Sequence, residues 1–397
     1  MYGEFRRRFW LPPRVHGEII EDRRVSWLEL FYDLIYVVVI GRTAHQLAGD
    51  VSWRGVFHFA VVFGLVWIAW MNGTLYYELH GREDGRTRVF VFIQMLILAL
   101  LAVYAGDAPG ADGSGFAIVY ILFLAVLTWL WYSVRRRDRQ EYMVATGRFL
   151  WAMVITIVTV AVSILVPAEE RVIIWAVLVL FWVVGGVVLA GAPGMDSALP
   201  VTESLVERYG LLVIIVLGEV VVGVVNGLSE AERSAEVIAT GLFGLSIGFA
   251  YWWTYFDFAG RRRPLAIPSV RLRWLFTHLP LTMAIGAAGA AMISLIEHGG
   301  EASTPSPTAW LLSGSVLVAL LALIVNLRTL EAVEDATAPA SVSLLVAGGV
   351  AIFFGWLAPR PWILAALLVM TLSGLWFYAV VRRYKGPSRL RSNSAPT

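Results

Sequence analysis

The sequence predicts an all-α fold, a polytopic membrane helix bundle of about twelve transmembrane helices. Of its 397 residues, 58% are hydrophobic and only 15% are charged, and the mean hydropathy is +0.72. A soluble chain of this length needs much more polar surface. In hydrocarbon every backbone polar group must be paired internally, which leaves helices and closed barrels. Long apolar runs such as Leu211–Val225, interrupted only by Glu219, exceed the length of a barrel strand and do not alternate, so helices are predicted.

Twelve apolar segments have about the length that crosses a hydrocarbon core of ~30 Å. They lie at residues 26–48, 51–76, 87–106, 114–134, 143–166, 171–192, 203–227, 235–258, 271–297, 308–329, 341–358 and 361–383. Residues 26–192 and 193–383 would each form a half of six helices. Residues 1–25 and 384–397 would be basic tails, because the amino-terminal arginines are not followed by the apolar core of a cleavable signal peptide.

The distribution of basic residues predicts the orientation in the membrane. With these segments, 24 of the 31 basic residues fall in the tails, in the loops on one side, or at the span ends that adjoin them. Four fall in the opposite loops, at Arg54, Arg171, Arg233 and Arg360. The arginine-rich side is cytoplasmic by the positive-inside rule, so both termini are expected in the cytoplasm.

Short motifs repeat weakly between the two halves. The matching pairs are Trp67–Asn72 with Trp252–Asp257, Phe90–Met95 with Trp274–Leu279, and Ile40–Arg42 with Leu217–Glu219. Their offsets are 185, 184 and 177 residues. Six helices per half return the chain to its starting side, so the halves would be parallel repeats about an axis along the membrane normal. Chance similarity between apolar helices is the alternative.

Ionisable side chains inside the spans are the informative positions. Each costs ~2.5–3.5 kcal/mol at a helix centre, and such residues usually face the interior of the bundle. In the first span, Glu29, Asp33 and Tyr36 are spaced for one helical face. The two carboxylates would repel, so one of them would hold its proton more tightly unless a cation lies between them. Arg42 and His45 lie further along the span, nearer the outside and on a different face.

The second half adds the candidates Glu207, Arg208, Glu219, Trp253, Asp257 and His278. The ionisable candidates of both halves can be sorted by their depth in the membrane. The charged inner group is then Glu29, Asp33, Glu207, Arg208, Asp257 and His278, and the outer group is Arg42, His45 and Glu219. Asp33 is the strongest candidate, since a carboxylate two turns into a span does not cap the helix.

Several of these positions also have a purely structural explanation. Ser26 and Glu29 match a capping box, so Glu29 could serve only the helix terminus. Arg42 and Glu219 could form a structural ion pair between the halves. The aromatic residues at 252–255 could be interfacial belt residues rather than a ligand cage.

Other classes of site and partner receive little support. His278 could simply hydrogen-bond a neighbouring helix, and the spacing of His45 and His278 does not favour haem or a metal. The chain has no cysteine, which excludes disulfides, thiolate metal sites and redox switching, and it has no P-loop, GxGxxG, HExxH or GxSxG motif. We expect no cofactor and no nucleic-acid partner. The flanking arginines would favour anionic membrane lipids.

Four segments match the signatures of a known family in the expected order. They are Ser26–Val37 (SWLELFYDLIYV), Glu207–Glu219 (ERYGLLVIIVLGE), Trp252–Asp257 (WWTYFD) and His278–Pro280 (HLP). Together they resemble the bacterial low temperature requirement A proteins, with departures at Tyr209 and Val220. The resemblance implies a multi-pass protein of the bacterial cytoplasmic (inner) membrane, associated by name with growth in the cold. It implies no defined biochemical activity.

The sorted charges favour a secondary transporter or channel with a pathway between the halves. Asp33 and Glu219 would bind protons or cations, and His278 would relay protons. An enzyme acting on a lipid-linked substrate, with the inner carboxylates as acid and base, is a weaker hypothesis. A sensor or scaffold that moves nothing is the third. The sequence indicates neither the substrate nor the oligomeric state.

Overall fold

The structure is a computed structural model that describes residues 9–18, 23–189, 201–232, 234–331 and 334–385. These residues form twelve helices and no β-strand, so the predicted all-α fold is confirmed. The helices are α2 Trp27–Gly49, α3 Trp53–His80, α4 Gly85–Ala105, α5 Gly113–Arg135, α6 Met143–Ser163, α7 Ala168–Leu189, α9 Glu203–Glu230, α10 Ala235–Phe258, α11 Pro268–Glu297, α12 Ser306–Leu327, α13 Glu334–Leu357 and α14 Pro361–Lys385. Each helix overlaps one predicted span.

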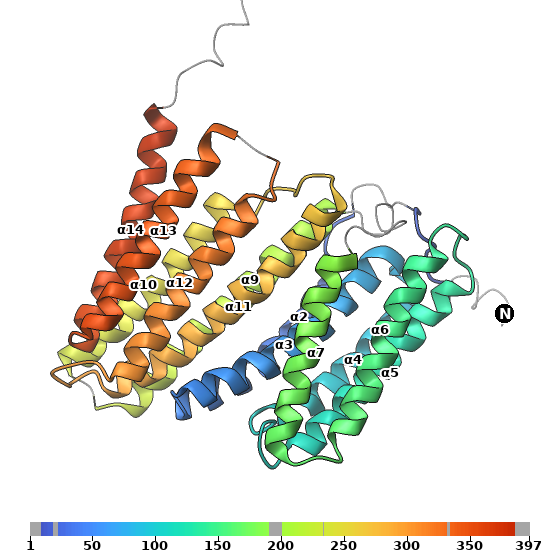
Figure 1. The fold of residues 1–397 in the computed structure, drawn as a ribbon, viewed down its shortest axis with the longest axis horizontal. Coiled ribbons are helices and arrows are strands. Elements are labelled where there is room, and N and C mark those ends of the chain that lie inside the picture. Colours follow the sequence, from blue (N-terminus) through green and yellow to red (C-terminus); the bar gives the residue numbers. More distant parts are fainter. Residues whose placement is uncertain (1–8, 19–22, 190–200, 233, 332–333, 386–397) are drawn as a thin grey trace, which may run out of the picture.

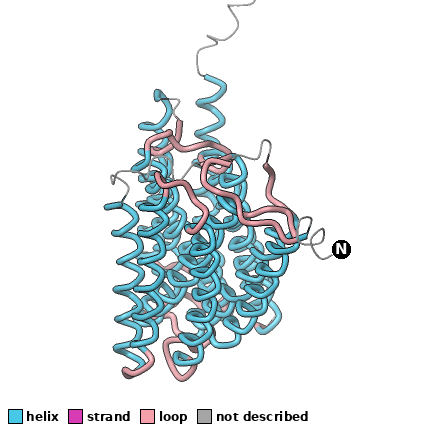
Figure 2. The backbone as a smooth tube through the Cα atoms, turned by 90° about the vertical axis from the view of Figure 1, so that its right-hand side faces the viewer, coloured by secondary structure: helices cyan, strands magenta, loops and turns pink. Residues whose placement is uncertain are grey.

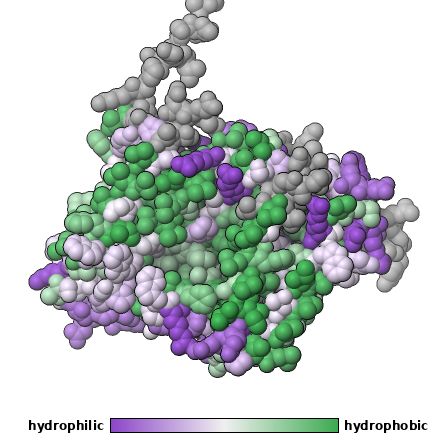
Figure 3. Space-filling view, in the orientation of Figure 1, coloured by the Kyte–Doolittle hydropathy of each residue, from purple (hydrophilic) through white to green (hydrophobic). Residues whose placement is uncertain are grey.

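The length and composition of the helices are those of a polytopic membrane protein. Among the described helices, ten are long and apolar enough to cross a membrane. α2 and α7 are not among these ten, and α2 carries Glu29, Asp33 and Arg42 within its apolar sequence. Figure 3 shows a broad hydrophobic band across the middle of one face, with hydrophilic residues gathered toward its ends. The total of twelve spans stays a prediction.

Polar residues set the start of several helices. The side chains of Ser26, Ser52, Asp84, Thr202 and Ser234 each accept a hydrogen bond from a backbone N–H of the first turn. These bonds satisfy donors that the helix itself leaves free. At the start of α2 the predicted capping box is formed, and Glu29 accepts a hydrogen bond from the Ser26 backbone N–H at 3.0 Å.

The helices gather into two groups that follow the order of the chain. In Figure 1, α2 to α7 lie on the right and α9 to α14 on the left, and the groups meet along α2, α3, α7, α9 and α11. Figure 2 shows the helix axes roughly parallel to one another, with connecting loops at both ends. α11 lies at the centre, since 89% of its most apolar stretch is buried.

The same neighbours recur in both groups. In the first group the packed pairs are α2–α3, α2–α4, α3–α5, α3–α7, α4–α5, α5–α6 and α6–α7. In the second group the packed pairs at corresponding places are α9–α10, α9–α11, α10–α12, α10–α14, α11–α12, α12–α13 and α13–α14. The second group also packs α10 on α11.

Glycines bring α9 and α11 into backbone contact. A Cβ atom added at Gly223 would lie 2.4 Å from the carbonyl oxygen of Gly289. A Cβ added at Gly289 would lie 2.9 Å from the carbonyl oxygen of Glu219. Small residues at helix crossings allow such close approach in membrane proteins. The contact fixes Glu219 at the junction of α9 with α11.

Candidate functional site

A buried ion pair joins the two groups of helices. The Arg208 guanidinium of α9 donates from Nε to Asp33 Oδ2 at 3.1 Å and from Nη2 to Asp33 Oδ1 at 2.9 Å. Both residues are fully buried, and the Trp70 indole of α3 donates to Asp33 Oδ1 at 2.9 Å. Two-pronged arginine–carboxylate contacts are strong and directional. Asp33 is therefore held by one helix of its own group and by one of the other.

Glu29 lies next to this ion pair and forms an ion pair with a second arginine, Arg23. Arg208 Nη1 is 3.7 Å from Glu29 Oε1, and Arg23 Nη2 donates to the same oxygen at 2.6 Å. The repulsion expected between Glu29 and Asp33 is therefore relieved, because Arg208 lies between the two carboxylates and Arg23 pairs with Glu29. Arg208 Nη1 is buried and has no hydrogen-bond partner within the described parts of the chain.

Glu78 completes the cluster, and the sequence did not point to it. Its carboxylate accepts hydrogen bonds from Thr202 Oγ1 at 2.6 Å and from Ser204 Oγ at 3.1 Å, and it also pairs with Arg23. The span predicted for this region ended at residue 76, whereas α3 continues to His80. Glu78 therefore belongs to a buried helical turn and not to a loop. Arg23 lies just before α2, in the segment that the sequence predicts only as a basic tail.

Aromatic rings surround the ion pair. Tyr32 and Tyr36 lie on the same face of α2 as Asp33, and their hydroxyl oxygens are 3.1 Å apart. The Arg208 guanidinium carbon is 5.9 Å from the centre of the Tyr32 ring, and Trp70 makes an edge-to-face contact with Tyr209 at 4.9 Å. Such rings exclude water and strengthen the electrostatic contacts between them.

His278 lies on α11 beyond Tyr209 and is fully buried. Its Nδ1 donates to the Trp274 carbonyl oxygen at 2.8 Å, so Nε2, 3.1 Å from the Tyr255 hydroxyl, is an acceptor in the neutral ring. The bond to Tyr255 joins α11 to α10. A hydrogen bond to a neighbouring helix is what a purely structural role of His278 predicts. The same contact places the basic Nε2 next to the Tyr255 hydroxyl, as a proton relay would require.

Glu219 and Arg42 do not form an ion pair. Arg42 is exposed, and its guanidinium lies near Gly106, where an added Cβ would be 3.0 Å from Nη2. The Glu219 carboxylate lies against Gly41 of α2, where an added Cβ would be 2.9 Å from both oxygens. Glu219 is only 7% exposed, and no hydrogen bond or ion pair reaches its carboxylate from the described residues.

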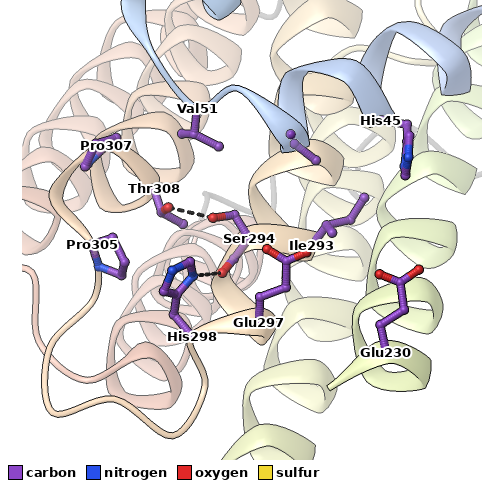
Figure 4. Close-up of a pocket in the computed structure, with 12 residues that line it drawn as sticks. His45, Val51, Glu230, Ile293, Ser294, Glu297, His298, Pro305, Pro307 and Thr308 are labelled. Atoms are coloured by element: carbon purple, nitrogen blue, oxygen red, sulfur yellow. Dashed lines mark hydrogen bonds between the residues drawn. The ribbon is translucent and has the colours of Figure 1, made fainter. Parts of the chain in front are cut away.

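A cavity of about 510 Å³ opens at the ends of α2, α9, α11 and α12 that lie nearest Glu219. We call it the outer vestibule, after the side on which the predicted orientation places these helix ends. Its polar lining residues are His45, Glu230, Ser294, Glu297, His298 and Thr308. Figure 4 shows His45, Glu230 and Glu297 directed into the same space from three helices. His45 is four residues beyond Gly41, which places it about 6 Å further along α2. On α2, a lining residue of the vestibule therefore lies about one helical turn from the residue that contacts Glu219.

The remaining candidates lie apart from the buried cluster. Glu207 is exposed and lines a separate cavity of about 330 Å³ with Arg261 and Arg263. On α10, the Trp253 indole donates to Asp257 Oδ2 at 3.1 Å, and its ring packs on Trp376 at 4.5 Å. Trp253 thus contacts α14, not the groups around Asp33. Within the described residues no group of three or more histidine and acidic side chains is arranged to hold a metal ion.

Comparison with known proteins places the chain in a family. The model described as bacterial low temperature requirement A protein (LtrA) matches residues 24–375. The chain belongs to the LtrA family. A relative from Rhizobium meliloti (strain 1021), named only as an uncharacterized protein, is 26% identical over 285 residues, which is 68% of each chain. No solved structure gives a significant match.

The match to LtrA spans both groups of helices and the site between them. It includes Glu29, Asp33 and Arg208 of the buried cluster and Glu219 beneath the vestibule. The first and second signature segments lie on α2 and α9, the two helices that the buried ion pair connects. Arg23 lies one residue before the matched region.

Proposed function

We propose that this LtrA protein is a proton- or cation-coupled secondary transporter or channel whose pathway lies between its two halves. The observation that carries the proposal is Glu219, a buried carboxylate without a partner among the described residues at the junction of α2, α9 and α11. Ionisable groups kept inside a membrane protein at this cost generally bind a transported ion or proton. Glu219 would take that role, with the outer vestibule as its entrance.

The buried cluster suits the role of an inner gate. Asp33 and Arg208 close the space between α2 and α9, and Arg23 covers Glu29 and Glu78 beside them. Protonation of Asp33 would remove half of the ion pair and free Arg208 to move. Acidic groups at the vestibule and an ion-paired gate at the other end fit alternating access from two sides.

The recurrence of helix neighbours supports two parallel repeats. Each packed pair named above for α2 to α7 has a counterpart in α9 to α14, in the order that a six-helix duplication would give. In such transporters the substrate site lies at the interface of the repeats. The excess of arginine on the Arg135–Arg137 side supports cytoplasmic termini and a place in the bacterial inner membrane.

Proton flux into proteoliposomes loaded with a pH-sensitive dye tests the proposal. Wild-type protein should conduct protons under an imposed potential, and Glu219→Gln should abolish this flux. Glu170→Gln makes the same chemical change at an exposed position in the first turn of α7, away from the vestibule, and should retain the wild-type flux. Wild-type flux in the Glu219 variant would contradict the role of Glu219, and no flux from folded wild-type protein would contradict a proton-conducting pathway.

A further inference from the structure

An arginine without a protein partner lies in an apolar groove on the side of the bundle away from the vestibule. The groove, between α6, α7 and α11, is lined by Arg148, Phe181, Trp182, Gly185 and Phe276. Arg148 Nη1 is buried and has no hydrogen-bond partner among the described residues. A buried guanidinium nitrogen without an acceptor is costly, because it has lost water and gained nothing in exchange.

The groove supplies no acceptor of its own but has room for one. Its other walls are aromatic, aliphatic or glycine, so no carboxylate or amide oxygen of the lining can satisfy Arg148. An added Cβ would meet nothing within 4 Å at Gly185, whereas at Gly186 it would lie 2.1 Å from the Phe276 ring. The groove is therefore closed where α7 meets α11 and open beside Gly185.

The groove lies near the ends of its three helices, on the side that the arginine distribution predicts to be cytoplasmic. Arg148 is five residues from the start of α6, which corresponds to about 7.5 Å. Gly185 is near the end of α7, and Leu272, another lining residue, is near the start of α11. All three helix ends are on the arginine-rich, cytoplasmic side. A guanidinium within two turns of a helix end can reach the headgroup layer through its long side chain, while apolar walls adjoin the acyl chains.

The surrounding charge favours a lipid with a net negative headgroup. Arg135 lies close by, since an added Cβ at Gly147 would be 3.5 Å from Arg135 Nη2. Two guanidinium groups attract a phosphodiester and disfavour a headgroup that carries its own ammonium. We propose that the Arg148 groove binds one anionic phospholipid of the cytoplasmic leaflet, with the phosphodiester on Arg148 and an acyl chain against Phe181 and Trp182.

Native mass spectrometry of the delipidated protein, titrated separately with phosphatidylglycerol and phosphatidylethanolamine of matched chains, tests this site. Wild-type protein should bind one phosphatidylglycerol, and Arg148→Gln should weaken that binding about tenfold, the loss expected for a charge-assisted contact to phosphate. Gly185→Leu should weaken it as well, because the new side chain fills the groove without changing any charge. Arg88→Gln removes an exposed arginine at the start of α4 and should bind as wild type does.

Three results would overturn the lipid assignment. Equal binding of phosphatidylglycerol by wild type and Arg148→Gln would show that Arg148 makes no contact with the lipid. Equal binding of phosphatidylglycerol and phosphatidylethanolamine would show that the groove does not select a lipid by its net negative charge. Displacement of phosphatidylglycerol by inorganic phosphate at similar concentration would make the groove a phosphate site instead. Melting curves of the variants show whether each remains folded, and Gly185→Leu tests the groove independently of charge.

Discussion

At the scale of single residues, Arg208 connects two carboxylates of α2 that would otherwise repel each other. It contacts Asp33 through two nitrogens and lies beside Glu29, and all three side chains are buried. A buried ion pair adds little over apolar packing, but removal of one partner leaves a buried charge unpaired. The consequence of breaking the pair therefore depends on whether one or both charges are removed.

Arg208→Met should lower the free energy of unfolding by about 3–5 kcal/mol, because Asp33 loses its cation. The double variant Arg208→Met with Asp33→Leu should be more stable than Arg208→Met alone, since no charge is left unpaired. Chemical denaturation in detergent micelles measures both. A double variant that loses the sum of the two single effects would show that the residues do not act as a pair.

The residue types of this cluster were predictable from the sequence, but their pairing was not. The spacing of Glu29, Asp33 and Tyr36 places them on one face of a helix, and burial of that face follows from hydrophobicity. The partner of Asp33 lies 175 residues away, on α9. Complementary charge and similar depth suggested Arg42 for Glu219, and the structure places Arg42 at Gly106 instead. Packing between distant helices decides which charges meet. Helical periodicity predicts the buried face of a helix but not the helix that packs on it.

At the scale of helices, the crossing of α9 and α11 depends on glycines. Gly223→Ala should lower the free energy of unfolding by about 1–3 kcal/mol, because its Cβ would collide with the Gly289 backbone and separate the helices. Gly218→Ala is the matched control on α9, since nothing lies within 4 Å of its added Cβ. That change should stabilise the protein by about 0.5–1 kcal/mol. Thermal unfolding followed by circular dichroism measures both, and equal effects would contradict the account of the crossing.

Residues 9–18, here called the amino-terminal strap, cover the end of α3. Arg14 Nε donates to the Gly81 carbonyl oxygen at 2.7 Å, and His16 Nδ1 bonds Asp138 Oδ2 at 2.5 Å. The His16 ring also stacks on Tyr142 at 4.7 Å and meets His80 edge-on at 4.6 Å. Burial holds the pKa of His16 below its ordinary value of 6.5, although Asp138 acts in the opposite direction.

Attachment of the strap should weaken as the pH falls below 6.5. A detached His16 takes up a proton near its ordinary pKa, whereas the buried ring takes it up only at lower pH, so acid favours detachment, by at most about 1.4 kcal/mol per pH unit. Hydrogen exchange of the strap, corrected for intrinsic rates, should be faster at pH 5.5 than at pH 7.5. His16→Gln should reduce this difference. His80, whose Nδ1 lies 2.9 Å from the Arg14 carbonyl oxygen, is also uncovered when the strap detaches and should account for the remainder. Equal protection of the wild-type strap at both values would refute the assignment.

At the scale of the whole molecule, the chain forms two groups of six helices with corresponding neighbours. The number and approximate bounds of the helices were predictable, because each apolar run has the length that a membrane crossing requires. The end of α3 was placed too early, since the run becomes polar at Tyr76–Glu78, and Glu78 was missed for that reason. The central position of α11 was not predictable, because an apolar helix surface can face either lipid or other helices.

The pathway proposed between the halves enters through the outer vestibule, and blocking that entrance tests the account most directly. The chain has no cysteine, so His45→Cys introduces one reactive thiol in the vestibule wall. A charged methanethiosulfonate reagent on this thiol should abolish proton flux in proteoliposomes. Trp53→Cys, at the same end of the bundle and on a position that is 86% exposed, should be labelled without loss of flux. Undiminished flux in fully labelled His45→Cys would contradict a pathway through the vestibule to Glu219.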